Sequence, residues 1–293
     1  MSQIGPHVRE EGFLASLEMT DSRNATLDAQ CRVCVEARVA KRFLLEISVQ
    51  TVEAAQAAKR GGAGRIELCA DLSVGGLTPP RELLRAARAA VRMPIFSMIR
   101  PRAGDFVYSA PEFEEMKRAI DVAKESGMNG VVLGILREDR SVDVDRTREL
   151  VERARPLPVT FHRAFDECSR KRSGDECTDF QQSLEDVIRT GAARILTSGG
   201  AKSALEGASI LRNLVQLAGE RIVILPGAGN SAENIAEVVR RTAAREFHSG
   251  LSSVLPYSSR DFARFETEVG KLARALAEEE KKLQNRKEKM GKF

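Results

Sequence analysis

The sequence predicts an α/β protein built as a single (β/α)8 TIM barrel, with an N-terminal extension before the barrel and a charged helical tail after it. Short apolar runs alternate with longer amphipathic stretches eight times over about 230 residues, which is the pattern of this barrel. The apolar runs are nearly continuous, as expected for parallel strands that helices cover. No Gly-x-Gly-x-x-Gly motif follows the first run, and this favours the barrel over an open doubly wound sheet.

Three segments are expected along the chain. Residues 1–41 show no clean period, and we interpret them as an extension that is mobile or loosely docked. Residues 42–276 hold the alternating pattern and are assigned to the barrel. Residues 277–293 are polar all round, so we interpret them as a solvated helical tail.

The elements of the barrel are justified by local signals. The strands are expected to begin near Phe43, Arg65, Pro94, Gly130, Pro158, Arg194, Arg221 and Ala244. The helices are expected to open near Thr51, Pro80, Pro111, Asp143, Gln181, Ser203, Ser231 and Asp261. Thr51 and Ser231 suit N-caps, whereas Pro80 and Pro111 suit the first turn of a helix. The Ser/Gly/Asp-rich segment from Cys168 to Phe180 is expected to be an inserted loop.

Composition excludes several classes of protein and partner. The 293 residues are 42% hydrophobic and 30% charged, which argues against a disordered chain, a collagen or a disulfide-stapled miniprotein. The net charge of +4 is small and Trp is absent, so we expect no nucleic-acid partner. No apolar run approaches the roughly 20 residues of a membrane helix, so we expect no membrane partner. Five Cys, an odd number, suit free thiols in a reducing compartment, and a cytoplasmic location is expected.

Polar side chains at the carboxyl ends of the strands define the candidate site, because active sites of this barrel lie on that face. Glu46, Glu67, Arg100 and His162 are the candidate catalytic residues. Glu67 lies in an apolar strand, so its carboxylate is expected to point into the barrel and to meet a cation, with Arg100 the nearest candidate. A structural layer of ion pairs is an equally weighted alternative to a ligand-binding role.

Three histidines occur in the chain, and two of them lie at expected strand ends. For His162 we favour a functional role as a ligand, a general acid or base, or part of a metal site. For His248 we favour a structural role, with the ring hydrogen-bonded inside a polar barrel mouth. His7 lies in the extension and is expected to be solvated.

An anionic group of a substrate is the ligand that the remaining candidates suit. Glycine loops after the sixth and seventh strands expose backbone N–H groups before a helix, where a phosphate or carboxylate can bind; tight turning alone is the alternative. The candidate anion- or substrate-binding residues are Arg102, Asp105, Arg163, Asp166, Ser198, Gly199, Gly200, Gly227 and Gly229.

Cys31 and Cys34 form a lone C-x-x-C pair in the extension. A structural zinc site needs four ligands, and no second pair occurs. Two soft thiolates can suffice for Cu(I), but two incidental thiols are the favoured interpretation.

Six motifs in register resemble the CutC copper homeostasis family over about residues 43–250. They are the segments 61–69, 73–79, 98–106, 160–166, 196–200 and 246–248. The resemblance implies a (β/α)8 barrel, usually a homo-oligomer, in the cytoplasm. It also implies a link to copper, with Cu(I) held by cysteines in at least some members, but no particular reaction.

The chain departs from the family pattern at one expected copper ligand. Ser48 stands where copper-binding members are proposed to carry a Cys, so Cys69 is the one metal-ligand candidate that carries over. A hydroxyl is a poor ligand for Cu(I), and the thioether of Met98, which could replace it, is expected to fill the core. We therefore expect weak or no stoichiometric Cu(I) binding at the barrel.

The function inferred from the sequence is copper homeostasis of the CutC type, with a copper ion or a small anionic molecule as the ligand. The alternative is a TIM-barrel enzyme of unknown reaction that acts on a small anionic or sugar-phosphate-like substrate. A scaffold for protein partners is a third reading, disfavoured because a scaffold has no need for so many ionisable groups at one barrel mouth.

Overall fold

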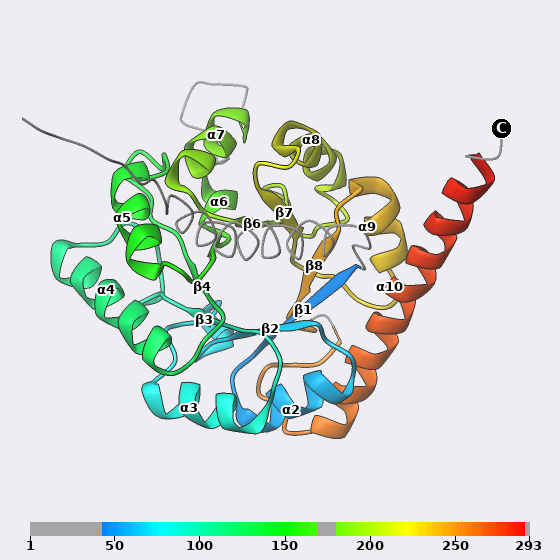
Figure 1. Cartoon of the computed structure of the whole chain (residues 1–293), viewed down its shortest axis with the longest axis horizontal. Coiled ribbons are helices and arrows are strands. Elements are labelled where there is room, and N and C mark those ends of the chain that lie inside the picture. Colours follow the sequence, from blue (N-terminus) through cyan, green and yellow to red (C-terminus); the bar gives the residue numbers. More distant parts are fainter. Residues whose placement is uncertain (1–42, 169–179, 253, 291–293) are drawn as a thin grey trace, which may run out of the picture. The chain divides into compact units, whose positions relative to one another are not determined.

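The computed structural model describes residues 43–168, 180–252 and 254–290. Eight parallel strands form one sheet in the order β7-β6-β5-β4-β3-β2-β1-β8, and helices surround it (Figure 1). The strands are β1 (Leu44–Val49), β2 (Arg65–Leu68), β3 (Ile95–Met98), β4 (Gly130–Leu133), β5 (Val159–Phe161), β6 (Arg194–Thr197), β7 (Val223–Pro226) and β8 (Glu246–Ser249). The predicted barrel fold is confirmed. The Cys31/Cys34 pair, His7 and residues 169–179 of the expected inserted loop lie outside the described residues.

Helices follow the strands at nearly the expected positions. They are α2 (Val52–Arg60), α3 (Arg81–Ala90), α4 (Ala110–Glu125), α5 (Val144–Ala154), α6 (Ala164–Glu167), α7 (Phe180–Thr190), α8 (Ala208–Ala218), α9 (Ile235–Thr242) and α10 (Phe262–Met290). The sequence analysis missed α6 and a 3-10 turn over Leu72–Val74, because each is too short to show a helical period.

The expected helix cap is right at Thr51, before the first helix of the barrel, and wrong at Ser231, before α9. Thr51 caps α2, since its hydroxyl accepts a hydrogen bond from the Ala54 N–H at 3.1 Å. Ser231 was expected to cap a helix, but α9 begins four residues later, after Asn234. The Ser231 N–H instead donates to Asn234 Oδ1 at 3.0 Å, so this segment is a turn that delays the helix.

The barrel is nearly closed, with its seam between β7 and β8. Parallel hydrogen-bonded ladders join the other seven pairs of neighbouring strands. At the seam, Asn230 Nδ2 donates to the carbonyls of Pro226 and His248, at 2.9 Å each. One amide therefore ties the carboxyl ends of the two seam strands together.

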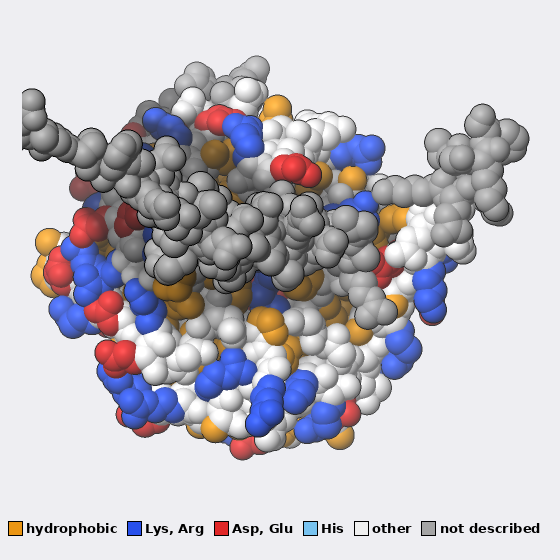
Figure 2. Space-filling model, viewed as in Figure 1, with side chains coloured by type: hydrophobic (Ala, Val, Ile, Leu, Met, Phe, Trp, Pro, Cys, Tyr) orange, Lys and Arg blue, Asp and Glu red, His pale blue; other side chains and the backbone are white. Residues whose placement is uncertain are grey.

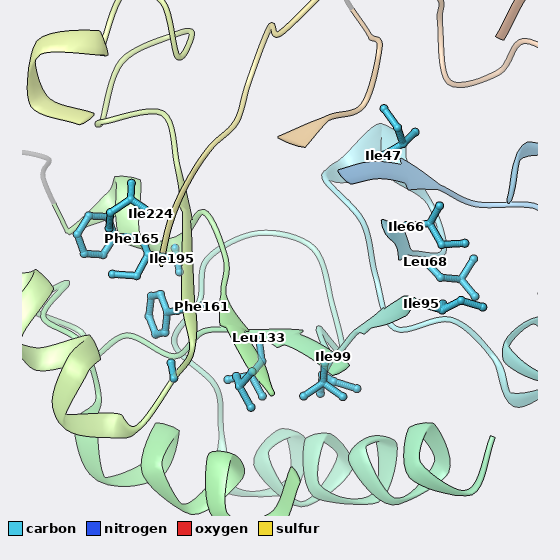
Figure 3. Close-up of a cluster of buried hydrophobic side chains, with 14 of the residues drawn as sticks. Ile47, Ile66, Leu68, Ile95, Ile99, Leu133, Phe161, Phe165, Ile195 and Ile224 are labelled. Atoms are coloured by element: carbon cyan, nitrogen blue, oxygen red, sulfur yellow. The ribbon is translucent and has the colours of Figure 1, made fainter. Parts of the chain in front are cut away.

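The hydrophobic core lies between the strands and the helices. Ile47, Ile66, Leu133 and Phe161 belong to different strands, and each is fully buried (Figure 3). Burying side chains of this size stabilises the fold by about 1.5–3 kcal/mol each. Because side chains alternate along a strand, the residues between these apolar positions point into the barrel.

The last helix completes the ring of helices. Figure 1 shows α10 running beside α2 and continuing past α9. The expected boundary at residue 276 falls inside this helix. Glu279 is 2% exposed and pairs with Arg240 of α9 at 3.5 Å, so the tail is not solvated on all sides as its composition indicated. Glu280 also accepts a hydrogen bond from the Phe43 N–H at 3.2 Å.

Charged side chains of both signs cover the outer faces of the helices, as Figure 2 shows for the side in view. Neighbouring helices are linked by surface pairs such as Arg81–Glu125 at 2.6 Å. Exposed pairs of this kind contribute little to the stability of a fold. The buried polar groups inside the barrel are expected to contribute more to it. Among the described residues, none of the helices is both long and apolar enough to span a membrane.

Candidate functional site

A cavity of about 640 Å³ opens at the carboxyl ends of the strands. Seven of the residues selected from the sequence line it, namely Glu67, Arg100, His162, Arg163, Asp166, Gly200 and Gly229. Ser48, Lys202, Asn230 and His248 also line it and were not selected as site residues. The expectation of a polar barrel mouth is therefore met in outline, but the pairing of its groups differs from the expected one.

A layer of ion pairs lies below the cavity, inside the barrel. Arg65 donates to Glu46 and, at 2.8 Å, to Glu246. Arg194 donates to the same Glu246 at 2.9 Å. The two guanidinium groups lie over the ring of Phe96, at 4.8 and 5.2 Å from its centre. The structural ion-pair alternative thus applies to Glu46, which is fully buried in this layer and does not line the cavity.

Glu46 is held in its ionised form despite its burial. Burial raises its pKa, but the charges of Arg65 and His248 and the hydrogen bonds that they donate outweigh this effect and lower the pKa to about 2. Glu46 Oε1 accepts from His248 Nδ1 at 2.8 Å, while Oε2 accepts from Arg65 Nε. Both carboxylate oxygens are therefore occupied by donors from the protein.

Glu67 has the opposite environment, one strand away. Burial is the largest influence and raises its pKa to about 7, although the charge of His248 opposes the rise. Cys69 Sγ donates to Glu67 Oε2 at 3.6 Å, and His248 Nε2 lies 3.9 Å from the same oxygen. Glu67 Oε1 is buried without a hydrogen-bond partner among the described residues.

Arg100 does not pair with Glu67, and this corrects the sequence-based expectation. Its guanidinium donates to the carbonyls of Val74, Gly76 and Gly104, at 2.8, 3.2 and 3.0 Å. The group also lies 4.9 Å from the centre of the Phe106 ring. Arg100 therefore fastens the loops that follow β2 and β3, and its Nε is a buried donor without a partner in the described part of the chain.

The two histidines of the barrel lie in different electrostatic environments. His162 Nδ1 accepts a hydrogen bond from the Ala164 N–H at 3.2 Å. Burial, followed by the charge of Arg100, lowers its pKa to about 3, so the ring is neutral and is a poor base at neutral pH. A Cβ at Gly134 would lie 2.7 Å from the ring, so this glycine is what leaves room for His162.

His248 lies between the two buried carboxylates. Burial lowers its pKa, but the charge of Glu67 and the hydrogen bond and charge of Glu46 outweigh burial and raise it. The ring is hydrogen-bonded inside the mouth, as expected, but it also lines the cavity and faces Glu67. Its place is set by β8 pairing with β1, where Glu46 is the partner of His248.

The loop after β6 is already occupied by a carboxylate of the protein. Asp166 accepts hydrogen bonds from the backbone N–H of Ser198 at 3.0 Å and of Gly200 at 3.2 Å, and from the hydroxyl of Thr197. The Gly199 N–H donates to Thr197 Oγ1 at 2.9 Å. Ser198 and Gly200 were expected to bind an anion of a substrate, and instead their N–H groups bind the carboxylate of Asp166.

The other expected anion-binding residues are dispersed. Arg163 lines the cavity but its Nε donates to Asp166 at 2.8 Å. Arg102 pairs with Asp105 at 2.8 Å and with Glu112 at 2.6 Å, outside the cavity. Gly227 also lies outside the lining, with its N–H bound to the Thr197 carbonyl at 2.9 Å.

Cys69 lies under the wall of the cavity and is fully buried. Burial, followed by the charge of Glu67, raises the pKa of this thiol well above its usual value. A Cβ on Gly76 would lie 2.8 Å from the Cys69 sulfur and 3.5 Å from the methyl of Met98, so the two side chains meet on the same side of this glycine. Met98 is packed in a small apolar cluster, as expected, and also lines the cavity.

Lys202 and Asn230 were missed by the sequence analysis. Asn230 directly follows Gly229 and Lys202 comes two residues after Gly200, and a place in these glycine loops is the signal that could have found them. Lys202 is an exposed cation at the rim, whereas Asn230 is buried at the seam.

Comparisons with known proteins agree on one family. Residues 43–253 match the model described as the CutC family. A human protein named copper homeostasis protein cutC homolog is 44% identical over 218 residues, which cover 74% of this chain and 77% of the human protein. A CutC family protein of Chromobacterium violaceum is 44% identical over 206 residues, covering 70% of this chain and 80% of the relative.

Solved structures give the same result for the fold. The crystal structure of a putative copper homeostasis protein CutC from Streptococcus agalactiae superposes with a TM-score of 0.65 at 30% identity. The match covers 71% of this chain and 98% of that protein. Thiamine phosphate pyrophosphorylase of Pyrococcus furiosus, at 17% identity and a TM-score of 0.53, shares the fold alone.

Proposed function

The chain belongs to the CutC family, and from this premise we propose that it takes part in copper homeostasis, with the barrel mouth as its ligand-binding site. The observation that carries the proposal is the family match over residues 43–253, which includes all eight strands and so the framework of the cavity. Relatives of this family carry the same role in their names.

The donors around Cys69 fit Cu(I) poorly. The thiol is neutral and fully buried, and the hydroxyl of Ser48 stands in place of a second soft ligand. The Met98 methyl and the Cys69 sulfur face the same side of Gly76, so the Met98 thioether could supply one soft contact. We expect weak Cu(I) binding at the barrel. If Cu(I) binds tightly at all, Cys31 and Cys34 are as good a pair of ligands as Cys69.

A competition titration with a Cu(I) chelator under reducing conditions tests this expectation. The proteins are the full chain, a truncation that begins at Lys41, and a Cys69→Ser variant of each. Weak binding that Cys69→Ser does not change, or tight binding that the truncation removes, agrees with the expectation of weak Cu(I) binding at the barrel. Tight one-to-one binding that survives truncation and disappears with Cys69→Ser would show that the barrel holds a second ligand for Cu(I).

A small-molecule enzyme is the second candidate, and one observation favours it. Glu67 Oε1, Arg100 Nε and His162 Nε2 are buried polar atoms without partners among the described residues, and all three residues line the cavity. Unpaired buried polar atoms cost about 1–3 kcal/mol each, so three of them around one cavity point to a polar ligand that pairs with them. Exposed Lys202 at the rim suits an anionic substrate.

Thermal unfolding with a panel of small sugar phosphates and carboxylates tests the enzyme candidate. A ligand should raise the unfolding temperature of the wild-type chain and have less effect on Lys202→Met, which lacks the rim cation. Lys59→Met, at the exposed end of α2, is the matched control. A panel without any effect would leave copper as the favoured ligand. Cytoplasmic location and homo-oligomer formation remain predictions, which fractionation and light scattering would test.

A further inference from the structure

The strongest unused feature of the molecule is the group formed by Glu46, Glu67 and His248 inside the barrel. One ligand atom of each residue lies within 4.8 Å of the others, and all three residues are buried. The residues come from β1, β2 and β8, which are neighbours in the sheet. The group is therefore held by three adjacent hydrogen-bonded strands.

Glu67 and His248 face each other without being hydrogen-bonded. His248 Nε2 lies 3.9 Å from Glu67 Oε2, which is too long for a hydrogen bond. Glu67 Oε1 is buried and has no partner in the described part of the chain. Arg100, the expected counter-ion, is turned away and bound to backbone carbonyls. A buried carboxylate oxygen left in this state calls for a partner that the chain itself does not supply.

Glu46 binds the other ring nitrogen of His248. It accepts a hydrogen bond from His248 Nδ1 at 2.8 Å, and Arg65 balances its charge. A carboxylate bound to one ring nitrogen fixes the tautomer and the orientation of the ring, leaving the second nitrogen free to bind a metal. Since both oxygens of Glu46 are already occupied, Glu46 is an orienting residue and not itself a ligand.

We propose that Glu67 and His248 bind a divalent transition-metal ion of the Zn²⁺ type inside the barrel, with Glu46 orienting His248. Two ligand atoms of a tetrahedral zinc ion lie about 3.4 Å apart, so a shift of about half an ångström would bring the observed pair into range. Both ligands line the cavity, which leaves the remaining coordination positions to water or to a small ligand.

The donor set separates this site from the Cu(I) site considered above. Imidazole and carboxylate favour divalent ions, whereas Cu(I) favours thiolate and thioether. Cys69 Sγ lies close by, 3.6 Å from Glu67 Oε2, but its thiol is neutral and points at a carboxylate. The proposal therefore goes beyond copper homeostasis, and a result on Cu(I) binding does not decide it.

Titration of the metal-free full chain with Co²⁺, followed by its visible absorption, tests the proposal, and Zn²⁺ is used to displace the Co²⁺. One-to-one binding is expected, with absorption bands of a site with nitrogen and oxygen ligands. Glu67→Gln and His248→Gln should each weaken binding by at least tenfold, and Glu46→Gln by about 10–100-fold. Glu53→Gln on α2 is the control, because it removes an exposed carboxylate that lies outside the group and does not line the cavity, and it should bind Co²⁺ like the wild type.

The rise in unfolding temperature on adding Zn²⁺ is the second readout, and His248→Asn is an alternative variant if His248→Gln does not fold. Absence of Co²⁺ binding at millimolar concentration would overturn the proposal, as would equal binding by the Glu67 and His248 variants. A sulfur-to-cobalt charge-transfer band that Cys69→Ser removes would overturn the assigned ligands. Failure of Cu(I) binding in the earlier titration has no bearing on these outcomes.

Discussion

At the scale of single residues, two glutamates on adjacent strands show how much a buried carboxylate depends on its neighbours. Glu46 lies opposite Arg65 in the register of β1 and β2, whereas Glu67 lies opposite Ser48. The first is paired and its pKa falls to about 2, and the second is unpaired and its pKa rises to about 7. The same residue type is therefore an ion-paired carboxylate at one level of the barrel and a carboxyl group with a raised pKa at the next.

Glu67→Gln should change how stability depends on pH. Because the native pKa of Glu67 lies above its unfolded value of 4.5, the native chain binds the proton more tightly. Its stability should then fall as the pH rises from about 4.5 to about 7, and this fall should be absent in the variant. The free energy of unfolding of the variant should rise relative to the wild type by on the order of 2–3 kcal/mol across this range. Urea unfolding at several pH values with EDTA present measures it, and Glu53→Gln on exposed α2 is the control; parallel curves for Glu67→Gln and wild type would contradict the assignment.

Glu46→Gln should strongly destabilise the barrel. The substitution keeps the shape of the side chain but leaves buried Arg65 with Glu246 as its remaining carboxylate and takes the hydrogen-bonded carboxylate away from His248, which costs about 3–5 kcal/mol. Glu185→Gln removes an equally well-formed pair with Arg221 on the surface, and its effect should be much smaller. Urea unfolding at pH 7 compares the two variants, and equal losses would show that burial of the pair is unimportant.

At the scale of elements, the segment between β2 and α3 forms one wall of the site. The isolated bridge between Ala70 and Leu77 folds the segment back on itself. Three polar groups of this segment form hydrogen bonds with Arg100. Arg100 binds the carbonyls of Val74 and Gly76, and its own N–H donates to Thr78 Oγ1 at 2.8 Å. The guanidinium of Arg100 is thus bound to backbone carbonyls of this segment, and it does not neutralise Glu67.

Gly76→Ala should disturb this wall. Gly76 has φ +87°, and an added Cβ would lie 2.8 Å from the Cys69 sulfur, so the change combines backbone strain with a clash. Gly219→Ala, where φ is +54° and no atom lies within 4 Å, reports the backbone strain alone. We expect a loss of about 1 kcal/mol for Gly219→Ala and about 2–3 kcal/mol for Gly76→Ala in urea unfolding. Equal losses in the free energy of unfolding would show that the segment between β2 and α3 accommodates the added methyl group without further destabilisation.

At the scale of the whole molecule, residues 42–293 form a compact unit with a core that extends from β1 to α10. Leu45 of β1 and Leu276 of α10 are both members of this core, so the first strand and the last helix of the unit share one hydrophobic core. The ring of helices closes where α10 meets α2.

Removal of residues 1–41 should leave this unit folded. A chain that begins at Arg42 keeps every described core residue and every ion pair of the barrel interior. Its free energy of unfolding in urea should equal that of the full chain within about 0.5 kcal/mol. A truncated chain that aggregates, or unfolds at clearly lower urea, would show that the extension contributes to the barrel.

The order of apolar and polar residues along the chain predicted the barrel and several of the residues at its mouth. Apolar runs predicted the strands, and their period-two alternation correctly turned Glu46 and Glu67 away from the helices. Strand ends then indicated Arg100 and His162 as cavity residues, because parallel strands present their carboxyl ends on one face. These inferences succeed because they depend on short stretches of chain.

Only the tertiary structure decided which of these groups meet. Closure of the sheet places β8 beside β1, so His248 reaches Glu46 across 202 positions of sequence, and no local pattern contains that pairing. The fold of one loop turns Arg100 from Glu67 to backbone carbonyls. A buried charge takes the partner that the packing brings within reach, and in a closed barrel that partner is set by strand order and register rather than by distance along the chain.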